Sequence, residues 1–235
     1  MGAAVLRARL PLETTFVEQI DEPTDEAVGY FAEVVERLGL AASAALVDSG
    51  GEPLNGEPPV PVDLLVNVSG NLRCKRLLSR ARRRAYVDVD PGFTQIWNAQ
   101  GLLSVDDHDV YFTIGENIGR PDCPIPTGGT DWRPTRPPVV LSDSPVAADS
   151  VHDRFTTVAS WRGGYGSLEF EGTRYGAKVH EFRKFVELPS RAPGTFEVAL
   201  DIHPAEEQDL ALLRDQGWVL VDPRQMASDP LTFRE

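Results

Sequence analysis

Three apolar segments that each run directly into a polar loop constrain the fold of this chain most. The segments are residues 63–68, 85–89 and 108–114, and the loops after them begin with Ser69-Gly70-Asn71, Asp90-Pro91-Gly92 and Gly115-Glu116-Asn117. Short apolar runs bounded by such turn residues are typical of buried strands in parallel sheets. Ligands of open α/β folds bind beyond the carboxyl ends of these strands. The repeat therefore predicts a parallel sheet with one ligand-binding edge.

The remainder of the first 150 residues alternates between strand-like and helix-like segments, as in a parallel α/β sheet. We expect further strands at residues 14–20 and 44–48, and helices at residues 24–39, 72–84 and 94–99. Two stretches rich in proline and glycine, residues 50–61 and 121–138, predict loops without regular structure. A short strand or crossover is expected at residues 139–141.

The remaining residues predict a second α/β unit. Strands are expected at residues 155–161, 196–201 and 218–222, helices at residues 178–186 and 206–216, and a hairpin at residues 168–175. Three strands and two helices make about half of a doubly wound domain. We therefore predict an α/β fold with two Rossmann-like units, residues 1–150 and residues 151–235, of which the second is incomplete. A helix start is expected after Pro230.

Composition excludes several classes of partner. The formal net charge of −13 argues against nucleic acid, because binding phosphates requires clustered Lys and Arg. No stretch approaches the length of a membrane span, and no secretory signal is expected. The two cysteines, Cys74 and Cys123, lie far apart and suggest neither a disulfide framework nor a metal site. These features predict a cytoplasmic location and no metal.

One basic run, residues 73–84, departs from the acidic average. On the expected helix it forms a basic face, which could hold a diphosphate or an acidic partner, or could be an ordinary solvated surface.

The acidic segment at the end of the central strand contains the sequence Asp88-Val89-Asp90. Two carboxylates at this spacing on a strand point to one side, and could hold a divalent ion through a substrate diphosphate. The alternative is that Asp90 caps the Pro91-Gly92 turn and that Asp88 pairs with the neighbouring arginines.

The other loops of the same edge carry groups suited to sugar hydroxyls. Asn117 offers both donors and acceptors, and its flanking glycines allow a close approach of the backbone. Ser69 and Asn71 are expected to bind substrate at the same edge. Either Asp90 or Glu116 could be the general base, although an ordinary turn explains the Glu116-Asn117 loop equally well. Trp132, Arg133 and Arg136 could clamp a ligand or pin their own loop.

In the second unit, Ser160, Trp161 and Arg162 follow the first strand and precede two glycines. Exposed backbone N–H groups and the guanidinium could bind phosphate there, or Trp161 could belong to the core.

Several longer strings carry a family resemblance. They are Asp90-Pro-Gly-Phe-Thr-Gln95, Tyr111-Phe-Thr-Ile-Gly-Glu-Asn-Ile-Gly119, Trp132-Arg-Pro-Thr-Arg136, Val158-Ala-Ser-Trp161 and Tyr175-Gly-Ala-Lys178. From residue 16 to the last residue the chain resembles bacterial, including actinobacterial, glycosyltransferase-like proteins of the GT-B type. The resemblance implies two Rossmann-like domains that face a cleft, an acceptor in the first, a nucleotide sugar in the second and no required metal or other cofactor. Relative to that pattern the chain is expected to be shortened at both ends.

The predicted function is sugar transfer from a nucleotide-sugar donor to the hydroxyl group of a small acceptor. Asp90, Thr94, Glu116 and Asn117 are expected to face the acceptor, and Ser160, Trp161, Arg162 and Lys178 the donor. The alternatives are a non-catalytic binding or partner protein, in which a second copy or another chain covers open sheet edges, and an inactive truncated homologue.

Overall fold

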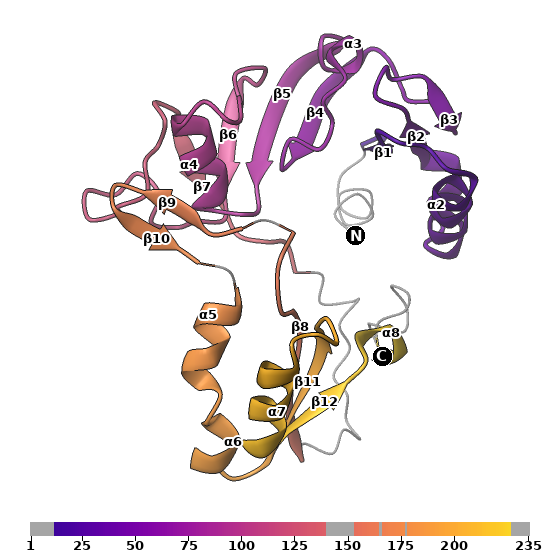
Figure 1. Cartoon of the computed structure of the whole chain (residues 1–235). Helices are drawn as coiled ribbons and strands as arrows, with labels where there is room; N and C mark the ends of the chain where they lie inside the picture. Colours follow the sequence, from indigo (N-terminus) through magenta and orange to yellow (C-terminus); the bar gives the residue numbers. More distant parts are fainter. Residues whose placement is uncertain (1–11, 140–152, 165, 177, 227–235) are drawn as a thin grey trace. The chain divides into compact units, whose positions relative to one another are not determined.

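The protein has a mixed α/β fold, shown by a computed structural model that describes residues 12–139, 153–164, 166–176 and 178–226 (Figure 1). The chain divides into two compact units, residues 1–145 and residues 146–235. The predicted boundary at residue 150 and the predicted helix start after Pro230 lie outside the described residues, as does most of the predicted strand at residues 139–141. No helix of the described ranges has the length and apolar content that a bilayer span requires.

The first unit begins with a small sheet in the strand order β1-β2-β3. Its elements are β1 (Phe16–Gln19), α2 (Asp25–Arg37), the 3-10 turn η1 (Ala41–Ser43), β2 (Ala44–Val47) and β3 (Pro53–Asn55). Helix α2 begins where Thr24 accepts a hydrogen bond from the backbone of Ala27, and it buries Phe31 and Val35 against β2. Strand β3 lies in a segment predicted to be a loop, and it runs antiparallel to β2 because a turn closed on Asp48 reverses the chain.

A second sheet of the first unit is entirely parallel, in the order β4-β5-β6-β7. Its elements are β4 (Val62–Val68), α3 (Lys75–Leu78), β5 (Ala81–Asp88), α4 (Phe93–Ala99), β6 (Val110–Thr113) and β7 (Trp132–Pro134). The three apolar segments that were predicted to share one parallel sheet do so. The core on one face of this sheet contains Tyr86, Val105, Ile118 and Trp132.

The opposite face of β4 is not covered in the described part of the chain. Side chains alternate along a strand, so Leu64, Val66 and Val68 share a face opposite to the buried Asn67. These three side chains are 58%, 47% and 46% exposed.

Two predictions about this sheet are wrong. The expected helix at residues 72–84 is one turn, α3, and the arginines after it belong to β5, where Arg82 pairs with Asp63 and Arg84 with Asp109. The basic run is thus divided between two elements, and several of its arginines pair with acids from other segments of the chain. The proline-rich segment contains β7, because the edge of β6 supplies a template on which Trp132 aligns with Tyr111.

The second unit contains a parallel sheet in the order β12-β11-β8. Its elements are β8 (Arg154–Ser160), β9 (Leu168–Phe170), β10 (Thr173–Tyr175), α5 (Lys178–Phe182), η3 (Arg183–Phe185), α6 (Leu188–Arg191), β11 (Thr195–Asp201), α7 (Glu207–Asp215), β12 (Trp218–Val221) and α8 (Pro223–Met226). The predicted hairpin is β9-β10. The core on one face of the sheet contains Trp161, Val179, Phe196, Val198, Leu200, Leu213 and Trp218.

Candidate functional site

The carboxyl ends of β4, β5, β6 and β7 lie along one edge of their sheet because all four strands are parallel. Backbone hydrogen bonds continue past the strands, from Ser69 to Val87, from Ile114 to Asp88 and from Thr135 to Thr113. The loops therefore leave the sheet side by side. The predicted site residues that the structure brings to this edge are Ser69, Asn71, Asp90, Thr94, Glu116 and Asn117.

Asp88, the last residue of β5, is fully buried and holds the edge together. Its Oδ1 accepts hydrogen bonds from the Asp90 backbone at 3.0 Å and from the Thr94 hydroxyl at 2.8 Å. Its Oδ2 accepts from the Gln95 amide at 2.8 Å and from the Thr113 hydroxyl at 2.6 Å. One carboxylate thus joins the turn after β5, the start of α4 and the end of β6, and its burial is tolerated because four donors satisfy it.

Two partners of Asp88 extend this arrangement into the loops. The Gln95 side-chain oxygen accepts from the Gly92 backbone at 2.6 Å, and the Thr113 hydroxyl accepts from the Gly115 backbone at 3.0 Å. We define the Asp88 hub as Asp88, Thr94, Gln95 and Thr113.

The hub changes the interpretation of two predicted residues. Asp88 is bonded to hydroxyl, amide and backbone donors, whereas the sequence suggested arginines. Thr94 is buried, and its hydroxyl group donates to Asp88 instead of facing an acceptor. Asp90, by contrast, is exposed. The two acids of the Asp88-Val89-Asp90 spelling therefore lie in opposite environments, and the described residues contain no cluster of acids, histidines and cysteines suited to a metal.

Tyr86 lies beneath the same edge and is almost completely buried. Burial, and next the charge of Asp88, raise the pKa of Tyr86 to about 12. Its ring lies within 3.0 Å of the position that a Cβ atom on Gly70 would occupy. The turn after β4 therefore requires glycine there, and the preceding Ser69 takes up a left-handed conformation with φ of 54°.

The loop after β6 lies directly against the loop after β5. A Cβ atom on Gly115 would approach Pro91 Cβ to 2.7 Å and Ile118 Cγ1 to 2.8 Å, so only glycine fits. The next residue, Glu116, pairs with Arg136 at 2.7 Å. The hydrogen bond from Arg136 holds the pKa of Glu116 below its usual range. A carboxylate held ionised in this way accepts hydrogen bonds readily but is a weak base.

The loop before β7 is pinned from within by Trp132. This side chain is buried, its indole N–H donates to the Thr127 carbonyl at 3.0 Å, and its ring contacts Tyr86 and Tyr111 edge-on. Of the three residues considered as a clamp, Trp132 therefore belongs to the core. Arg133 lies near Asp131 at 3.7 Å, and Arg136 holds Glu116.

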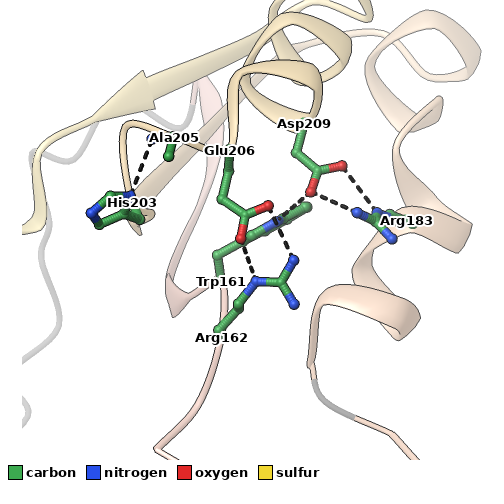
Figure 2. A network of polar contacts seen from close by, with 7 residues as sticks. All are labelled: Trp161, Arg162, Arg183, His203, Ala205, Glu206 and Asp209. Atoms are coloured by element: carbon green, nitrogen blue, oxygen red, sulfur yellow. Dashed lines mark hydrogen bonds and ion pairs between the residues drawn. The ribbon is translucent and has the colours of Figure 1, made fainter.

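The second unit has a polar network at the carboxyl edge of its own sheet (Figure 2). Asp209, a buried residue of α7, accepts from the Trp161 indole at 2.8 Å and from two nitrogens of Arg183 at 3.0 and 2.7 Å. Arg162 forms a separate ion pair with Glu206. The Arg183 hydrogen bond is the main reason that the pKa of Asp209 lies below its ordinary value.

This network accounts for two of the four predicted donor-side residues. Trp161 is buried in the core of the unit, and the Arg162 guanidinium is engaged by Glu206. Ser160 is half-buried at the end of β8, and Lys178 is exposed at the start of α5. The sites therefore differ, because the edge of the first unit carries several exposed polar side chains and that of the second unit carries paired ones.

Sequence reasoning missed Gln95, Thr113, Arg183 and Asp209. A usable signal existed for the two buried acids. Asp88 interrupts an apolar strand, and Asp209 lies one helical turn before the buried Leu213, on the apolar face of α7. An acid at an otherwise apolar position indicates an internal partner.

Comparisons with known proteins give no match among family models, curated proteins or solved structures. The resemblance to GT-B-type glycosyltransferases therefore stays a prediction.

Proposed function

We propose that the carboxyl edge of the sheet β4-β5-β6-β7 binds a small hydroxyl-rich ligand of the sugar class. The observation that carries this proposal is the Asp88 hub, which fixes the loops after β5 and β6 from beneath while Asp90, Glu116 and Asn117 stay exposed. A ligand is bound most tightly by polar groups that are already positioned before it arrives.

The exposed groups match the chemistry of a sugar. Ionised carboxylates accept hydrogen bonds from hydroxyl groups, and the amide of Asn117 both donates and accepts. Ser69 and Asn71 add further polar groups from the loop after β4.

Sugar transfer, as the resemblance implies, is the reaction that we propose for this edge within a Rossmann-like, GT-B-like arrangement. A transferase needs a base that can take the proton of the acceptor hydroxyl. The two candidate bases are Asp90 and Glu116, and the hydrogen bond from Arg136, which lowers the pKa of Glu116, makes that carboxylate a weaker base than an ordinary Glu. The nucleotide sugar is assigned to the second unit, with Ser160 and Lys178 as its contacts. A cytoplasmic location belongs to the same proposal and is supported by two free cysteines.

The binding proposal is tested by the thermal unfolding of the full chain in the presence of a panel of nucleotide sugars and free sugars. We expect at least one of them to raise the melting temperature. The double variant Glu116→Ala, Asn117→Ala should abolish that shift. The control Asp107→Ala changes an exposed acid in the loop before β6, at the opposite edge, and should preserve it. A panel without any effect, or a shift that the double variant retains, contradicts the proposal.

A second candidate function, a partner protein without catalysis, is favoured by β4. This edge strand has seven residues and three exposed apolar side chains. If a second copy paired antiparallel about Leu65, Val62 would face Val68 and Leu64 would face Val66, so apolar residues would meet. Light scattering after size exclusion then shows a dimer, which Val66→Lys dissociates. A wild-type monomer at high concentration excludes this function.

A further inference from the structure

An apolar groove of about 260 Å³ lies between β1 and α2 in the first unit. None of its lining residues belongs to the candidate site at the carboxyl edge of the sheet β4-β5-β6-β7, and the proposed function does not use it. Its lining residues on β1 and in the segment that follows it are Phe16, Glu18 and Ile20, and those on α2 include Tyr30, Phe31 and Val34.

Strand β1 is the edge strand of its sheet, and the groove opens beside it. The Ile20 backbone donates to the Val47 carbonyl, so the residues at even positions of β1 are bonded to β2. Because successive residues of a strand point their backbone groups in opposite directions, the N–H and C=O groups of Val17 and Gln19 point away from β2. Within the described part of the chain β1 pairs with β2 alone, and outward-pointing backbone groups next to an apolar groove are the geometry used for the addition of a strand by a partner peptide.

The negative charge around the groove favours a basic partner. Residues 13–36 contain eight acids and no Lys or Arg. One of these acids, Glu18, lines the groove itself, together with two partly exposed aromatic residues, Phe16 at 39% and Tyr30 at 57%. A carboxylate beside aromatic rings attracts a Lys or Arg side chain through charge and through the faces of the rings. A second copy of β1 would instead bring like charges together.

We propose that β1 and this groove bind an extended segment of a partner polypeptide in which apolar and basic residues alternate. The segment pairs with the backbone groups of Val17 and Gln19 that point away from β2. Its apolar side chains enter the groove, and a Lys or Arg lies next to Glu18.

The test uses a fluorescent, capped seven-residue peptide of alternating Leu and Arg and follows its anisotropy with the full chain. We expect binding that Glu18→Lys weakens roughly tenfold. Tyr30→Ala, at an exposed position, weakens it severalfold. The matched control Glu36→Lys reverses a charge on α2 outside the groove and changes the affinity less than twofold.

The peptide itself supplies two further controls that do not depend on the folding of any variant. Methylation of its alternate backbone nitrogens removes the hydrogen bonds to β1 and should abolish binding. A peptide of alternating Leu and Glu should not bind.

Four results overturn the proposal. They are no binding at millimolar peptide, equal binding of the Leu-Glu peptide, binding that survives methylation, and binding that Glu18→Lys leaves unchanged. Deletion of residues 1–11 provides one more outcome. An affinity that rises more than tenfold on this deletion assigns the groove to the beginning of this chain and excludes a separate partner.

Discussion

At the scale of single residues, the buried acids Asp88 and Asp209 contribute most to the candidate sites. Asp88 is satisfied without any cation, by four donors from its own unit. Asp209 is satisfied by Arg183 and Trp161. Both acids could be singled out from the sequence as polar residues at apolar positions. Their partners could not, because Thr113 is 25 residues from Asp88 and Trp161 is 48 residues from Asp209.

We expect Asp88→Asn to lower the free energy of unfolding by about 2 to 3 kcal/mol. The new NH₂ group would face the Gln95 amide and the Thr113 hydroxyl, and both of these already donate to position 88. Urea unfolding followed by tryptophan fluorescence measures the change. The control Asp63→Asn, at a side chain that is 91% exposed, should stay within about 0.5 kcal/mol of the wild type. Equal effects of the two substitutions would show that the hub is not structural.

The pH dependence of stability provides a second prediction at this scale. The folded state lowers the pKa of Asp209, so its contribution to stability is complete above the ordinary Asp pKa and is lost as the pH falls through the folded value. Asp209→Asn should therefore destabilise the second unit by about 2 kcal/mol at neutral pH. The difference in the free energy of unfolding between the variant and the wild type should become smaller below about pH 4.

Denaturation curves collected across that pH range measure this difference in the free energy of unfolding. Asp215→Asn, in an exposed position at the end of α7, is the matched control and should show no such narrowing. A difference in the free energy of unfolding that stays constant with pH would contradict a stabilising role of the Asp209–Arg183 pair.

At the scale of elements, most strands and helices follow from local patterns, but several do not, among them β3, the first half of β5 and β7. The run of arginines before Tyr86 fits a helix as well as a strand. It forms a strand because it pairs in parallel with β4, where Arg83 lies beside Leu64 and Arg84 beside Leu65. Strand β7 has three residues and ends in proline, so it forms only on the edge that β6 provides. Pairing between strands joins residues that are far apart in the sequence, so a prediction made from single segments cannot include it.

Two glycines give predictions of opposite sign. Gly115→Ala should destabilise the first unit by about 1 to 3 kcal/mol, because the new methyl group would overlap Pro91 and Ile118. Gly29→Ala, within α2, has open space around it and should stabilise the protein by up to about 1 kcal/mol. Urea midpoints of the two variants provide the comparison, and a neutral Gly115→Ala would mean that the loops after β5 and β6 are not in close contact.

At the scale of the whole molecule, the sequence predicted an α/β fold with parallel sheets, which the structure has, and the chain divides into two compact units. Each unit has a buried core of its own. We therefore expect hydrogen exchange to respond unit by unit. Asp88→Asn should accelerate exchange in peptides from residues 12–139, and Asp209→Asn in peptides from residues 153–226. If either variant accelerated exchange equally throughout the chain, the two units would unfold as one.

The position of the Asp88 hub beneath the loops has a consequence for how this protein can change. The scaffold and the exposed surface of this edge depend on different side chains, since Thr94, Gln95 and Thr113 are buried while Asp90, Glu116 and Asn117 are exposed. The outer set can be replaced, by natural drift or by design, without disturbing the inner one. Substitutions at the outer positions can accordingly change what the proposed site would bind while the architecture stays the same.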